Sequence, residues 1–110
     1  MKTSTLKTYH CQVHFYDRSK TPEVDITAEV AEENTAHLLV YTVNGANVTI
    51  TPDDADDNGK PFRLETTWAA GAASNGTVKI TLRHEPDKSA ANADETGEVD
   101  AAAEFTVRVQ

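Results

Sequence analysis

Apolar and polar residues alternate along five separate segments of this chain, and no other feature constrains its fold as strongly. The segments are residues 5–16, 46–52, 62–68, 77–84 and 103–109. A period of two residues is typical of a β-strand that buries one face. The predicted inward residues are Tyr9, Cys11, Val13, Phe15, Val48, Ile50, Phe62, Leu64, Thr66, Trp68, Val78, Ile80, Leu82, His84, Phe105, Val107 and Val109. Two packed sheets are the simplest way to cover all of these faces.

Three further local signals complete the predicted fold. Residues 37–43 form a continuous apolar run, rich in β-branched and aromatic residues, which predicts a buried strand. Residues 25–35 place apolar residues at helical spacing and predict a short helix, with Asp25 as its N-cap and Glu29 in its first turn. Asn44-Gly45 predicts a tight hairpin. We therefore expect six or seven strands in an all-β, immunoglobulin-like antiparallel β-sandwich with one short helical crossover.

Composition limits the classes of function. The chain has 110 residues, which fits a single sandwich domain spanning 1–110. With 18 acidic and 10 basic residues its net charge is −8, which repels phosphate backbones and argues against nucleic-acid binding. This charge suits a soluble surface protein, a cation binder or a partner for a basic surface. Cys11 is the one cysteine, so no internal disulfide forms, and no apolar run approaches the roughly 18–20 residues that cross a bilayer.

The acidic stretch 54–65, DADDNGKPFRLE, matches the calcium-loop pattern D-x-[DN]-x-[DN]-G-x5-E at every defined position. Calcium takes about six to eight oxygen ligands, which a curled loop of this kind supplies. The predicted ligands are the side chains of Asp54, Asp56, Asn58 and Glu65 and the backbone carbonyl of Lys60. The alternative is an acidic turn between strands, because Asp, Asn and Gly are also the preferred turn residues. The strand-like flanks and Pro61, which lacks an N–H, argue against an EF-hand.

No catalytic motif stands out, and we do not expect an enzyme. The sequence shows no nucleophile elbow, no Gly-rich phosphate loop and no paired catalytic carboxylates. Histidine is a ligand of zinc and copper, so a site shared by histidines of neighbouring strands is an alternative. His10 and His14 lie on one strand face, about 13 Å apart, which is too far to share one ion. His84 continues an inward register, and we expect it to hydrogen-bond to backbone or to a carboxylate at the rim of the core.

Four short motifs occur together in the chain. They are an acidic helix before an H-x-x-x-Y strand (37–41), a D-x-[DN]-G-N-P-type loop (56–61), a T-T-W-x-x-G-A-A-S-x-G segment (66–76) and an L-R-H-x-P stretch (82–86). A strand ending in Gln110 closes the chain. This combination, which runs from residue 26 to the C-terminus, resembles a family of small secreted lipoproteins from the Bacteroidetes.

The resemblance implies an exported, lipid-anchored β-domain at the cell surface or in the periplasm. It also implies a non-enzymatic accessory role beside TonB-dependent outer-membrane receptors, in nutrient or metal uptake. His37, Trp68 and His84 carry over as recurrent positions, and we treat them as weak candidates for contacting a ligand or partner. The chain as written has no signal peptide and no lipid-attachment motif. The surface location therefore applies to a mature domain whose export segment has been removed, and the alternative is the cytoplasm.

Three functions follow as hypotheses. The first is a cell-surface binding or accessory domain that serves an outer-membrane receptor or another protein partner. The second is a structural domain stabilised by Ca²⁺, the one cofactor that the sequence suggests. The third is an interaction module that presents acidic loops, chiefly 53–60 and 85–100, to a basic partner.

Overall fold

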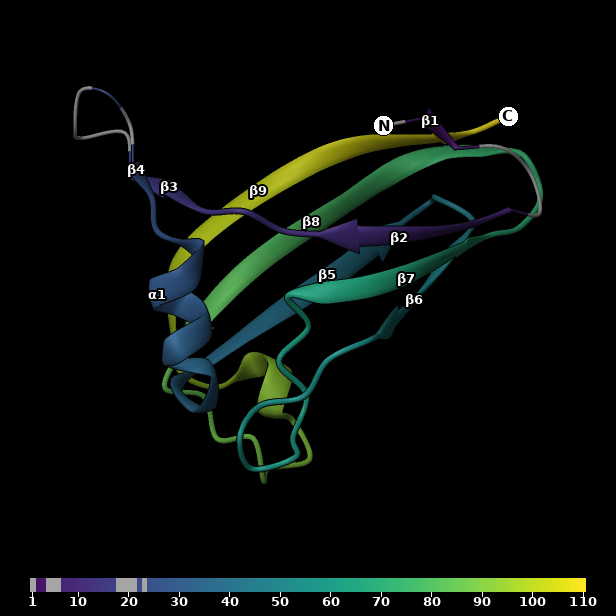
Figure 1. Cartoon of the computed structure of the whole chain (residues 1–110). Helices are drawn as coiled ribbons and strands as arrows, with labels where there is room; N and C mark the ends of the chain where they lie inside the picture. Colours follow the sequence, from purple (N-terminus) through teal and green to yellow (C-terminus); the bar gives the residue numbers. More distant parts are fainter. Residues whose placement is uncertain (1, 4–6, 18–21, 23) are drawn as a thin grey trace.

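Two β-sheets pack face to face in the computed structural model of this chain, which describes residues 2–3, 7–17, 22 and 24–110 (Figure 1). The large sheet has the order β1 (Lys2–Thr3), β9 (Glu98–Val109), β8 (Ser74–His84) and β5 (His37–Asn44). The small sheet has the order β2 (Thr8–Gln12), β7 (Glu65–Ala70) and β6 (Val48–Pro52). A separate pair joins β3 (Tyr16–Asp17) to β4 (Val24–Asp25). All described strand pairs are antiparallel except β1 with β9, and the predicted all-β sandwich is confirmed.

The core lies between the two sheets and is built from the alternating residues that the sequence predicts. The four predicted inward residues of segment 62–68 are all buried. Trp68 of the small sheet packs with Val78 and Val107 of the large sheet. A second cluster, which includes the helix, contains Val30, Leu39, Phe62, Leu64 and Leu82. Because full burial of one large apolar side chain contributes about 1.5–3 kcal/mol, these two clusters hold the sheets together.

The predicted helical crossover is present as α1 (Thr27–Glu32) followed by a 3₁₀ turn at Asn34–Ala36, and it leads from β4 into β5. The N-cap position is Ile26 and not the predicted Asp25, because Asp25 is still paired with Tyr16 in the β3–β4 ladder. The Asp25 side chain nevertheless accepts a hydrogen bond from the Thr27 N–H at 2.9 Å. Thr27 is buried, and its hydroxyl accepts the Phe15 N–H, which ties the helix to the chain beyond β2.

The prediction of a tight hairpin at Asn44-Gly45 is wrong. β5 pairs with β8 and β6 pairs with β7, so the chain crosses from one sheet to the other at this corner. Gly45 has a φ of 77°, which favours glycine, and the corner packs closely on the start of β8. A Cβ at Gly76 would lie 2.1 Å from the Ala46 backbone nitrogen, so no side chain fits there. The turn residues are those of a hairpin, but the pairing partner is set by packing elsewhere.

Several predicted boundaries also shift in the structure: β2 ends at Gln12 and not at residue 16, and β7 covers Glu65–Ala70 and not residues 62–68. β8 starts at Ser74 and β9 at Glu98, whereas the alternation predicted starts at residues 77 and 103. The two strands pair along their whole length, so the polar residues at the start of each strand are also part of the ladder. The loop that remains, residues 85–97, contains a 3₁₀ turn at Ala93–Glu95. In the first predicted strand, residues 5 and 6 lie outside the described residues.

Within the part of the chain that the structure describes, no helix is both long enough and apolar enough to cross a membrane.

Candidate functional site

β9 is next to the short edge strand β1 in the large sheet, and β2 is an edge strand of the small sheet (Figure 1). β9 pairs with β8 along its length, but it pairs with β1 only at Arg108 and Val109. On the edge of β9 that faces away from β8, no described strand therefore pairs with the residues from Glu98 to Phe105. An edge of this kind presents backbone N–H and C=O groups to any extended chain that approaches it.

The inward face of β9 is covered at one end and uncovered along the rest. Phe105 is paired directly with Val78, and residues paired in an antiparallel ladder point to the same face. Val78 is fully buried, yet Phe105 is 48% exposed. The next inward residue, Val107, is buried again, and the inward residues Ala101 and Ala103 are exposed like Phe105. The predicted inward orientation of Phe105 is thus right, but nothing in the described chain covers it.

The uncovered face forms the wall of a groove. Its apolar end has a volume of about 320 Å³ and is lined by residues of both sheets, including Val13, Phe15, Trp68, Leu82, Ala103 and Phe105. Its polar end has a volume of about 460 Å³ and reaches α1, with Glu29, Glu33, His37 and Asp100 in its lining. Both ends share Phe15, Leu82 and Ala101 in their linings, so they lie next to each other. We name the two ends together the β9 groove.

Of the weak sequence candidates, His37 lines the polar end and stacks on His84, and Trp68 lines the apolar end. His37 and His84 face each other in the β5–β8 ladder, and their rings stack with centroids 5.1 Å apart. Trp68 is 2% exposed, lines the apolar end and donates its indole N–H to the Thr66 hydroxyl at 2.9 Å. Cys11 also lines the apolar end, and burial raises the pKa of its thiol, so the thiol stays protonated at neutral pH.

His37 is the buried polar group of the groove. Its side chain is 7% exposed, and its Nδ1 lies 3.1 Å from the Glu33 carbonyl oxygen. A carbonyl only accepts, so Nδ1 carries the proton, and in the neutral ring Nε2 is an acceptor. Nε2 lies 3.7 Å from Asp100 Oδ2, which is too long for a hydrogen bond. Asp100 Oδ2 is also 4.0 Å from His84 Nδ1, so the expected contact of His84 with a carboxylate is a loose one.

The two stacked rings are not arranged as metal ligands. The two rings are stacked with their planes inclined by only 24°, so their nitrogen lone pairs lie in two separate, nearly parallel planes, which does not suit ligation of one ion. His10 lies 2.9 Å from Asp53, and His14 lies 3.6 Å from Asp25, so each of these histidines has a different neighbour. Among the described residues, no three His, Cys, Asp or Glu side chains are grouped so that they could hold a metal ion.

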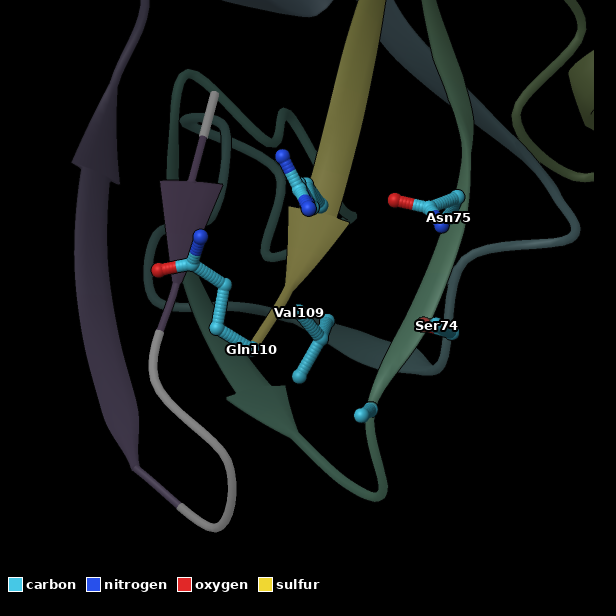
Figure 2. Close-up of a pocket in the computed structure, with 6 residues that line it drawn as sticks. Ser74, Asn75, Val109 and Gln110 are labelled. Carbon is cyan, nitrogen blue, oxygen red and sulfur yellow. The ribbon is translucent and has the colours of Figure 1, made fainter.

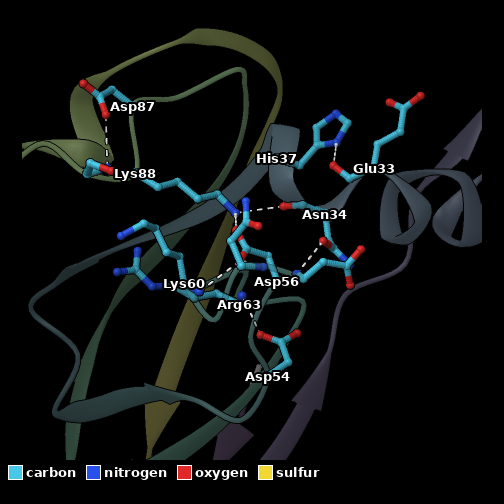
Figure 3. Close-up of polar contacts among 12 residues, drawn as sticks. Glu33, Asn34, His37, Asp54, Asp56, Lys60, Arg63, Asp87 and Lys88 are labelled. Carbon is cyan, nitrogen blue, oxygen red and sulfur yellow. Dashed lines mark hydrogen bonds and ion pairs between the residues drawn. The ribbon is translucent and has the colours of Figure 1, made fainter.

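A buried ion pair joins Asp56 of the acidic loop 53–60 to Lys88 of the loop 85–97 (Figure 3). Lys88 Nζ lies 2.8 Å from Asp56 Oδ2 and also donates to the Asn34 carbonyl at 2.8 Å. Asp56 Oδ1 accepts the N–H groups of Asn58 and Lys60, both at 2.9 Å. Burial by itself would raise the pKa of Asp56. The hydrogen bond from Lys88, the two N–H donors and the lysine charge together outweigh burial and lower this pKa.

The other predicted calcium ligands have separate partners. Asp54 accepts the Arg63 N–H at 2.7 Å with one oxygen and the Glu65 N–H at 3.0 Å with the other. The carbonyl of Lys60 accepts the Asp56 N–H at 2.7 Å. The Glu65 carboxylate lies 4.0 Å from His10, and Asn58 is exposed. A calcium ion would therefore have to displace Lys88 and reorient these groups, and calcium binding stays a prediction.

Sequence reasoning missed Lys88 and Asp100. Lys88 is the one basic residue of the acidic segment 85–100, and this isolated positive charge was a signal that it pairs with a carboxylate. The sequence predicts a loop over 85–100, but Asp100 lies in β9 beside an irregularity in the ladder between Leu82 and Arg83. Such a bulge changes the direction in which a side chain points, and the sequence gives no signal for it.

A further open pocket lies where β8 begins and β9 ends (Figure 2). It has a volume of about 420 Å³, and Ser74, Asn75, Val109 and Gln110 contribute to its lining. Its lining contains a hydroxyl, two amides and the charged Arg108, but no carboxylate side chain and no histidine. It therefore offers neither an acid–base pair nor a metal ligand set.

Comparison of the chain with protein-family models, with curated proteins and with solved structures gives no match. The resemblance to surface lipoproteins stays a prediction. The β9 groove and the Asp56–Lys88 pair are the features of the described chain from which a function can be argued.

Proposed function

We propose that this chain is a non-enzymatic binding module that accepts an extended protein segment in the β9 groove. The segment would lie beside β9 as an added strand and cover the inward side chains of that strand. The observation that carries the proposal is the exposure of Phe105, at 48%, between the buried Val78 across the ladder and the buried Val107 along the strand.

The chemistry of the groove favours an extended segment over a small molecule. A strand added to a free edge gains main-chain hydrogen bonds along its length, and its alternate side chains enter the apolar groove. The apolar end offers Ala103 and Phe105 from one sheet and Val13 and Phe15 from the chain that follows β2. An apolar lining of this kind provides affinity by burial of the side chains of the bound segment.

Charge favours a basic partner over a second copy of this chain. In an antiparallel pairing of two β9 strands centred on Ala101, Glu98 of one copy would face Glu104 of the other, and like charges placed opposite each other are destabilising. Each copy also carries a net charge of −8. The same negative charge attracts a segment rich in Lys or Arg.

The proposal joins two of the hypotheses drawn from the sequence, the surface accessory domain and the acidic interaction module. An outer-membrane receptor for a nutrient or metal, the partner that the lipoprotein resemblance implies, is a candidate source of the bound segment. In that case this domain would act at the cell surface or in the periplasm, attached to the membrane through a lipid anchor.

The test is selection of random peptides displayed on phage against the wild-type chain. Binding of the selected peptides is then measured by the fluorescence of Trp68, which is the chain's one tryptophan and lines the groove. We expect Phe105→Asp to abolish binding. The matched control is Val99→Asp, because Val99 is 55% exposed on the same strand but pairs with Arg83 and not with a core residue.

Both variants replace an exposed apolar residue, so both should fold, and thermal melts check this. Retention of binding in Val99→Asp with loss in Phe105→Asp supports the groove. Equal binding by the two variants, or no peptide enriched on the wild-type chain, would refute the proposal.

A further inference from the structure

We infer that the polar end of the β9 groove receives a cationic side chain, a Lys or Arg of the bound segment, between His37 Nε2 and the Asp100 carboxylate. This inference rests on the proposed function and adds to it the residue class that the groove selects. The segment would therefore carry alternating apolar residues for the apolar end and a basic residue at the position that reaches α1.

The first argument is a pair of facing acceptors. His37 Nε2 and Asp100 Oδ2 lie 3.7 Å apart. Nδ1 of His37 donates its proton to the Glu33 carbonyl, so Nε2 of the neutral ring carries no proton. Nε2 and the carboxylate oxygen are therefore both acceptors, and neither can donate a hydrogen bond to the other. An ammonium or guanidinium group placed about 2.9 Å from each atom would donate to both. His37 Nε2 has no hydrogen bond within the described residues, although its side chain is only 7% exposed.

The second argument is the charge of the surrounding residues. Glu29 and Glu33 lie one helical turn apart and line the same end of the groove as Asp100. No ion pair joins the side chain of Glu29 or Glu33 to another described residue, and no Lys or Arg is among the described residues that line this end. Three carboxylates in one partly closed space attract a cation and repel an acidic segment.

The experiment uses the peptides selected on the wild-type chain. We expect Lys or Arg at one fixed position of the enriched peptides. Replacing that residue by norleucine, which keeps the apolar stem, should weaken binding about tenfold, since hydrogen bonds to charged groups are among the strong ones. Asp100→Asn should weaken binding of the basic peptide by a similar factor and leave the affinity for the norleucine peptide unchanged.

The matched control is Glu104→Gln, which removes the same charge from the same strand. Glu104 pairs with Lys79 on the opposite face, so this variant should change the affinity less than about twofold. A structural role of Asp100 would weaken both peptides equally, and that result would overturn the inference.

The two proposals fail in different ways. If enriched peptides bind the groove but norleucine and Lys peptides bind equally well, the cation site is refuted and the proposed function stands. If no peptide distinguishes the wild-type chain from Phe105→Asp, both are refuted. A fixed basic residue whose contribution disappears in Asp100→Asn but persists in Glu104→Gln supports both.

Discussion

Replacement of Lys88 by methionine should destabilise this chain strongly at neutral pH, although Lys88 lies in a long surface loop. The Lys88 side chain is 7% exposed and that of its partner Asp56 is 1% exposed, so the pair is buried. Methionine keeps most of the apolar stem that lies near Phe62, where Nζ is 5.8 Å from the ring centroid. The variant therefore removes the charge and leaves the Asp56 carboxylate buried without a counter-ion.

The size of the expected loss of stability depends on the hydrogen bonds that Asp56 keeps in the variant. Breaking a buried pair by removing one partner costs about 3–5 kcal/mol. Asp56 keeps two N–H donors, from Asn58 and Lys60, so we expect a loss near the lower end, about 3 kcal/mol. For a domain of this size such a loss corresponds to a fall in melting temperature of roughly 10–20 °C. It is a large part of the total stability of a small domain, which is about 5–15 kcal/mol.

The assay is urea unfolding followed by circular dichroism at pH 7, with Lys60→Met as the matched control. Lys60 lies in the same acidic loop, and its side chain makes no ion pair with a described residue, so this control should lose less than about 0.5 kcal/mol. The double variant Asp56→Asn, Lys88→Met should recover part of the loss, because the uncompensated charge is gone. A loss below about 1 kcal/mol in Lys88→Met, the value of an exposed pair, would refute the reasoning.

Two other predictions concern the same loop. Since the pKa of Asp56 is lowered in the folded chain, its contribution to stability is present above its unfolded pKa of about 3.9 and is lost as pH falls through the lower folded pKa. The difference in unfolding free energy between wild type and Lys88→Met should therefore narrow as the pH falls below about 5 and through the lowered folded pKa, and a constant difference would contradict this assignment. For the calcium hypothesis, thermal melts in Ca²⁺ and in EDTA give the answer: a midpoint raised by Ca²⁺ and returned to baseline by Asp56→Ala would support a metal loop. Equal midpoints would identify residues 54–65 as an acidic turn held by Lys88.

The sequence predicted the parts of this fold that depend on local periodicity. The inward faces of residues 65–68 and 77–84 follow from alternation, because successive side chains of a strand point to opposite faces. Pairing partners do not follow from it. Asn44-Gly45 has the residues of a hairpin, but β5 and β6 end in different sheets because each finds its ladder further along the chain.

The candidate site was predictable only in part, for the same reason. The sequence indicates His37, Trp68 and His84 one by one; the fold places His37 and Trp68 in the lining of the groove and stacks His84 on His37. The partner of Asp56 lies 32 residues away in the sequence, and no local pattern indicates that distance. The exposure of Phe105 is set by the absence of a neighbouring strand in the described chain, and alternation carries no information about neighbours.

The pairing of Lys2 with Arg108 brings the two ends of the described chain side by side. Asp100 lies eight residues before Arg108 on β9, which is roughly 27 Å along an extended strand. α1 and the two acidic loops lie at that far end of the sandwich (Figure 1). A tether, a fused domain or an immobilising tag joined to the C-terminal end, where β9 runs away from the acidic loops, would therefore leave the acidic pole facing away from the attachment. The molecule can be held at one pole while the polar end of the groove stays accessible.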